Sequence, residues 1–156
     1  MKRDEKTIAV LNDLIRINND RIEGYEKALN HTDENDVDLR NIFSRMAQDS
    51  RTYSRELTDQ VQRLGGDPAS GTTASGKVYR VWMDVKSGFS SSGRKSVLEE
   101  CEYGEDAAQK AYEKALDHEN ALPTEVAQLV KEEKESLRSL HDMIKSYRDM
   151  HRRAHN

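Results

Sequence analysis

The sequence predicts an all-α protein, a four-helix bundle in which one long connection separates two helical hairpins. Apolar residues recur at helical spacing over long stretches, while both prolines and most glycines fall between those stretches. A seven-residue segment also occurs twice in slightly altered form, as YEKALNH at residues 25–31 and as YEKALDH at residues 112–118. The repeat indicates two related helices at equivalent places in the bundle.

Composition limits the class of protein. A chain of 156 residues suits a single domain over residues 1–156. Charged residues make up 35% and aromatic residues 6%, but the apolar periodicity favours a bundle with a charged surface over disorder. The net charge of −4, with both signs interspersed, provides no basic footprint for nucleic acid.

The cysteine content and the hydropathy of the chain predict its cellular location. The single cysteine, Cys101, excludes an internal disulfide and fits a reducing compartment. No apolar run approaches the length of a membrane span, and the charged start MKRDEK is unlike a signal peptide. We therefore expect a cytoplasmic protein that is not bound to a membrane.

The first two helices are predicted over residues 4–30 and 37–64. Residues 33–36 (DEND) form the turn between them and supply an N-cap. The second helix ends at residues 65–68 (GGDP), a strong C-terminal signal. In the first helix one stripe faces inward: Ile8, Leu11, Ile15, Asn18, Ile22, Tyr25 and Leu29.

Residues 65–96 are rich in Gly, Ser and Thr and form the long connection. Within them Val78, Trp82 and Val85 stand at i, i+4 and i+7, which predicts a short helix over residues 77–86. Because an extended chain covers about 3.3 Å per residue, this connection can run the length of the bundle. We then expect the second and third helices to be parallel. The alternative is a flexible linker.

The third helix is predicted over residues 95–119 and the fourth from Thr124 to about residue 151. The inward face of the fourth helix is ambiguous. In one rotational phase of the helix, the inward residues are apolar: Val126, Leu129, Val130, Leu137, Leu140, Ile144 and Tyr147. A rotation by one position turns inward Lys134, Arg138 and His141 instead.

Four segments carry a resemblance to a known group: residues 18–25 (NNDRIEGY), 80–84 (RVWMD), 102–106 (EYGED) and 140–142 (LHD). They resemble an uncharacterised bacterial family of ferritin-like four-helix bundles, distantly similar to bacterioferritin- and rubrerythrin-type proteins. The resemblance covers nearly the whole chain and implies a ferritin-like fold with a long crossover between the second and third helices. It implies no established activity.

Ferritin-like di-metal sites use a Glu from each of two helices and a Glu-x-x-His motif from each of the other two. The resemblance puts Asn18 and Glu105 at the single-ligand positions, seven residues before Tyr25 and Tyr112. The two motif positions fall on Ser50-x-x-Tyr53 and Arg138-x-x-His141. Only Glu105 and His141 retain metal-binding side chains, so we expect the di-iron site to be lost.

A buried Glu105 without a counter-charge would cost several kcal/mol or be driven neutral. The hypothesis is that Arg138 pairs with it, while Asn18, Ser50 and Tyr53 complete a polar core cluster. In the alternative, Arg138 faces solvent and Glu105 is protonated or reaches water. A relocated metal site could instead draw on nearby acids, namely Glu23, Glu56, Glu102 and Glu133.

The leading functional prediction is a non-enzymatic ferritin-like bundle without a cofactor or catalytic residues, a stress-related structural or binding protein that self-associates as a homo-oligomer such as a dimer. The first alternative is a divergent iron- or manganese-binding oxidoreductase or storage protein that uses Glu105, His141 and nearby acids. The second is a small-ligand pocket at mid-bundle, lined by Asn18, Tyr53 and Glu105.

Overall fold

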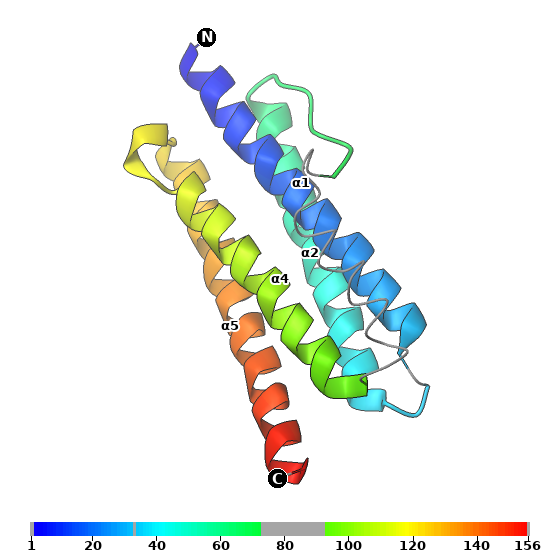
Figure 1. Cartoon of the computed structure of the whole chain (residues 1–156). Helices are drawn as coiled ribbons and strands as arrows, with labels where there is room; N and C mark the ends of the chain where they lie inside the picture. The colour runs from blue at the N-terminus through cyan, green and yellow to red at the C-terminus, as the bar shows by residue number, and fades with distance from the viewer. Residues whose placement is uncertain (1, 33, 73–92, 156) are drawn as a thin grey trace.

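Four long helices make up the part of the chain that this computed structural model describes, residues 2–32, 34–72 and 93–155 (Figure 1). They are α1 (Lys2–His31), α2 (Val37–Arg63), α4 (Gly93–Ala115) and α5 (Thr124–His155), with one turn of 3-10 helix, η1 (His118–Asn120), between the last two. None of these residues lies in a β-strand. The predicted all-α class is confirmed.

The helices form two hairpins, α1 with α2 and α4 with α5. Figure 1 shows α2 and α4 running in one direction and α1 and α5 in the other. Helix α1 also contacts α4, and α2 contacts α5, so each helix has two antiparallel neighbours. The parallel course of α2 and α4 agrees with the prediction from the long connection. The short helix predicted over residues 77–86 lies outside the described residues.

The two ends of α2 follow the predicted signals. The Asp36 side chain accepts a hydrogen bond from the Leu39 N–H, at 3.4 Å, and thereby caps the first turn. At the other end the Gly65 N–H bonds to the Gln62 carbonyl and the Gly66 N–H to the Val61 carbonyl, both at 3.0 Å. This Schellman pattern needs a left-handed residue, and Gly65 supplies it with φ of +80°.

Replacing Gly65 with alanine should therefore lower the free energy of unfolding by about 1 kcal/mol, because a Cβ is strained at positive φ. The space around Gly65 is open, so strain alone carries the effect. Gly71 also has open space but no positive φ, and Gly71→Ala is the matched control. Urea denaturation of both variants tests this; equal effects would contradict it.

After α2 the chain turns back onto α1. Asn12 accepts a hydrogen bond from the Ala69 N–H at 2.8 Å and donates one to the Asp67 carbonyl at 3.1 Å. Asn19 donates to the Gly71 carbonyl at 2.9 Å. These hydrogen bonds hold the beginning of the connection against α1.

Helix α4 ends at Ala115, earlier than the predicted residue 119. Asn120 explains the difference, because its side-chain amide donates to the carbonyls of Lys114, at 2.9 Å, and Ala115, at 3.1 Å. Those carbonyls belong to the last turn, which has no further helical N–H groups to bind them. The chain then passes through η1 to Thr124.

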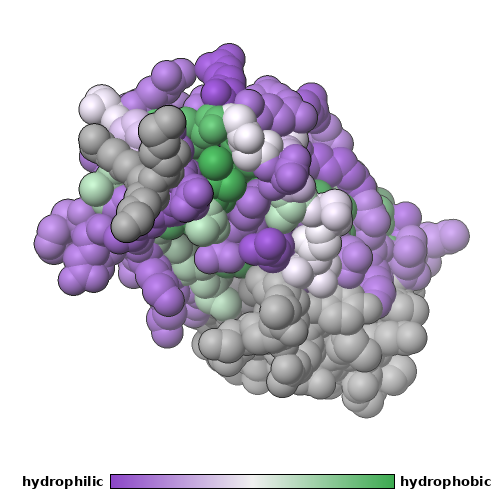
Figure 2. Space-filling view, turned by 90° about the horizontal axis from the view of Figure 1, so that it is seen from above, coloured by the Kyte–Doolittle hydropathy of each residue, from purple (hydrophilic) through white to green (hydrophobic). Residues whose placement is uncertain are grey.

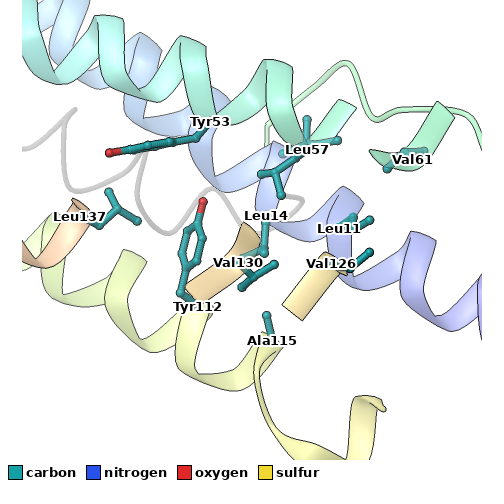
Figure 3. Packing of buried hydrophobic residues seen from close by; sticks show 11 residues of the cluster. Leu11, Leu14, Tyr53, Leu57, Val61, Tyr112, Ala115, Val126, Val130 and Leu137 are labelled. Atoms are coloured by element: carbon teal, nitrogen blue, oxygen red, sulfur yellow. The ribbon is translucent and has the colours of Figure 1, made fainter. Parts of the chain in front are cut away.

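The buried residues form two apolar clusters at different levels of the bundle. One contains Tyr25, Phe43, Met46, Cys101 and Ile144 among others. The second, shown in Figure 3, contains Leu11, Leu57, Val61, Tyr112, Val126 and Val130 among others. A layer of buried polar side chains lies between the two levels. Among the described residues, no helix has both the length and the apolar character needed to cross a membrane.

Candidate functional site

The layer between the apolar clusters contains one fully buried cation. Arg21 of α1 and Glu105 of α4 are each 1% exposed, and Asn18 of α1 and Ser50 of α2 are fully buried. We call the central cluster the set of these four residues with Tyr25, Tyr112 and Glu133. Every one of the four helices contributes to it.

Arg21 and Glu105 form the ion pair of the central cluster. The Arg21 Nη2 donates to Glu105 Oε1 at 2.7 Å, and its Nε donates to the same oxygen at 3.3 Å. The Arg21 Nη1 donates to Ser50 Oγ at 2.7 Å, and Ser50 donates in turn to the Met46 carbonyl at 2.7 Å. Burial by itself lowers the pKa of Arg21, but the adjacent Glu105 carboxylate holds that pKa above its ordinary value. Arg21 is therefore a permanent internal cation.

Tyr25 completes the surroundings of this pair. Its hydroxyl donates to Glu105 Oε1, and Arg21 Cζ lies 5.6 Å from the centre of its ring. Burial, and then the negative charge of Glu105, raise the pKa of Tyr25 well above its usual value. The phenol stays neutral and remains a hydrogen-bond donor. The hydrogen bonds from Arg21 and Tyr25 to Glu105 all reach Oε1, and the buried Oε2 has no hydrogen-bond partner among the residues that the structure describes.

Tyr112 links the ion pair to a second buried acid. Its hydroxyl donates to Glu133 Oε1 at 2.7 Å and accepts from Asn18 Nδ2 at 2.9 Å. Asn18 accepts in turn from Arg21 Nη1 at 3.4 Å. Figure 3 shows the Tyr112 ring rising from α4 with its hydroxyl directed toward the first hairpin. One chain of hydrogen bonds thus joins Glu133 on α5 to Glu105 on α4.

Glu133 is 1% exposed, and none of the described residues provides a cation as its hydrogen-bond partner. Its pKa is raised to about 9, chiefly by burial; the hydrogen bond from Tyr112 lowers it, and the nearby Glu56 carboxylate raises it further. Below that pH Glu133 is a neutral acid. The central cluster therefore contains one ion pair and one uncharged carboxyl group, and its net charge is close to zero.

The sequence repeat has a structural counterpart in this cluster. Tyr25 of the first copy bonds Glu105, the residue seven positions before Tyr112. Tyr112 of the second copy bonds Asn18, the residue seven positions before Tyr25. Because α1 and α4 are antiparallel neighbours, each tyrosine reaches the polar residue of the opposite copy.

A model of the family described as a domain of unknown function, DUF2383, matches residues 6–119 of the 156-residue chain. The chain belongs to this family. No curated protein matches it. The predicted resemblance to a family without an established activity is confirmed to that extent. In this DUF2383 protein the match contains Arg21 and Glu105, whereas Glu133 lies beyond it.

Two predicted members of the polar core, Arg138 and Tyr53, require correction. Arg138 is exposed, so it does not pair with Glu105, and Arg21 from α1 takes that place. Helix α5 adopts the apolar phase, in which Leu137 and Leu140 are 0% and 3% exposed. The spacing of Arg21, three residues after Asn18 and four before Tyr25, is compatible with the same helix face, but the predicted stripe contained Ile22 at that level. In the structure Ile22 is only partly buried and Arg21 is buried.

The structure brings together Asn18, Ser50 and Glu105 but separates the other candidates from them. The Tyr53 hydroxyl bonds Ser136 and does not join the central cluster. His141 Nε2 lies 2.7 Å from Asp106 Oδ1 at the edge of the bundle, where the Asp106 side chain is 55% exposed. Of the acids considered for a relocated site, Glu23 is exposed and the Glu102 side chain is outside the described part, while Glu56 does lie near Glu133.

The donor set does not fit a di-metal site. Of the predicted ligand positions, Glu105 provides a carboxylate. The Nη2 atom of the Arg21 guanidinium lies 2.7 Å from Oε1 of that carboxylate. That permanent positive charge would repel a divalent cation at the same oxygen. No three His, Cys, Asp or Glu side chains converge as metal ligands within the portion of the chain that the structure describes.

Proposed function

We propose that this DUF2383 protein is a non-enzymatic, ferritin-like helical bundle, a structural or binding module whose central ion pair replaces a di-iron centre. The observation that carries the proposal is the buried Arg21, 2.7 Å from the Glu105 carboxylate. The two related hairpins and the parallel α2 and α4 support the ferritin-like part of it.

The chemistry of the central cluster supports a positioning role over a catalytic one. Glu105 is neutralised by Arg21, and Tyr25 and Tyr112 keep their protons because burial raises the pKa of each. No nucleophile within the cluster has an adjacent base that would activate it. Buried ionic groups of this kind can specify one register among helices that apolar packing alone would leave interchangeable. A stress-related role, a cytoplasmic location and a homo-oligomeric state belong to the same proposal.

One observation favours a second candidate, a protein that binds a single iron or manganese ion. In the described part of the chain, Glu105 Oε2 and Glu133 Oε2 are both buried without a hydrogen-bond partner, and carboxylate oxygen atoms are metal donors. Such a site would use Glu105 and Glu133, and His141 would have to leave Asp106 to join them.

Metal analysis separates the two candidates. We expect the chain, purified without a histidine tag, to contain far less than one iron or manganese per molecule, and chelation to leave its melting temperature unchanged. Arg21→Gln removes the competing charge and is the matched variant, in which any latent affinity should increase. Stoichiometric metal in the unaltered chain, lost together with stability on chelation, would overturn the proposal.

A further inference from the structure

An open groove lies between α1 and α4 and is lined by side chains outside the central cluster. Its volume is about 440 Å³, within the range of small-molecule sites. The apolar residues that line it are Val10, Leu14 and Ile17 of α1 and Ala111 and Ala115 of α4. Two alanines one turn apart on α4 leave room that larger side chains would fill.

The apolar lining of the groove is accessible. Val10, Ile17 and Ala111 are each partly exposed, although neighbouring positions on the same helices are fully buried. In Figure 2, the view from above, hydrophobic residues are visible at the surface among hydrophilic ones. The groove therefore presents an apolar interior to a ligand with an apolar body.

The rim carries more positive than negative charge. Arg16 on the α1 side is bound to Asp13, with 3.0 Å between Nη1 and Oδ1. Lys114, on the opposite wall, is exposed and enters no ion pair within the described part of the chain. One ammonium group is thus available next to the apolar interior.

We infer that this groove binds a small amphipathic anion, a molecule with an aliphatic or aromatic body and an acidic head group. The body lies along Ile17 and Ala111, and the head group meets Lys114. The inference goes beyond the proposed function, because it needs neither the central ion pair nor the absence of metal.

Isothermal titration calorimetry with dodecanoate, below its critical micelle concentration, tests the inference on the full chain. We expect one molecule bound per chain. Acetate has the head group alone, and dodecyltrimethylammonium has the same tail with the opposite charge. Both should bind at least tenfold more weakly than dodecanoate. Equal binding of the two long-chain probes would overturn the assignment of an anion.

Variants locate the site. Lys114→Glu should weaken dodecanoate binding at least tenfold, whereas Lys131→Glu, an equal change at an exposed position on α5, should change it less than twofold. Ala111→Phe fills the groove and should abolish binding, with circular dichroism to verify the helices. Since Lys114 is exposed, its variant decides the matter even if Ala111→Phe fails to fold. Unchanged binding in Lys114→Glu would refute the site.

A second copy of the chain is the competing occupant. If sedimentation shows a dimer that Ala111→Phe dissociates and that dodecanoate leaves intact, the groove is a subunit interface and the inference fails. Metal content is measured separately, so this failure is distinguishable from failure of the proposed function.

Discussion

Arg21→Met should lower the free energy of unfolding by about 3–5 kcal/mol, because removing one partner of a buried ion pair leaves an uncompensated charge. In this chain the stranded group would be Glu105, which is 1% exposed and has its neighbours arranged around Arg21. Ser50 and Asn18 would lose a donor at the same time. Urea denaturation followed by circular dichroism measures the effect.

The exposed Arg138 provides the matched control, and Arg138→Met should change the free energy of unfolding by less than about 1 kcal/mol. Adding Glu105→Gln to Arg21→Met should recover a large part of the loss, since the amide still accepts the hydrogen bond from Tyr25 and carries no charge. Equal effects of the two arginine substitutions would show that Arg21 is not the internal counter-charge.

Glu133→Gln should make the protein more stable at alkaline pH, by about 5 kcal/mol at pH 8, and should have almost no effect near pH 4. The pKa of Glu133 is raised to about 9 in the folded chain, against about 4.3 for an unfolded glutamate. Between these two values the folded state binds a proton that the unfolded state has released. The contribution of Glu133 to stability is therefore complete below pH 4.3 and is lost as the pH rises toward 9.

Glutamine is uncharged at every pH and can still accept the hydrogen bond from Tyr112. The difference in unfolding free energy between the variant and the unaltered chain, measured in urea from pH 4.5 to 9, isolates this group. Glu135→Gln, an exposed substitution on the same helix, should leave the pH dependence unchanged. A constant difference across that range would mean that Glu133 is not a buried neutral acid.

The sequence by itself determined the helices and their order. Apolar residues at helical spacing marked all four, and the signals of glycine and Asp36 marked the ends of α2. The length of the connection predicted that α2 and α4 are parallel, and the repeat placed Tyr25 and Tyr112 on the inward face. These properties are local or depend on chain length, so a single sequence contains them.

Only the tertiary structure decided the partners within the central cluster. On a helix, adjacent residues point about 100° apart, so a stripe with polar members fits two phases, as it did around Leu137 and Arg138. In the sequence, Arg21 cannot be distinguished from other charged residues at the edge of the apolar stripe. Its burial follows from the packing of α1 against α4, which brings Glu105 within 2.7 Å. The raised pKa of Glu133 likewise depends on tertiary packing, because burial between the helices raises it most and Glu56 of α2 raises it further.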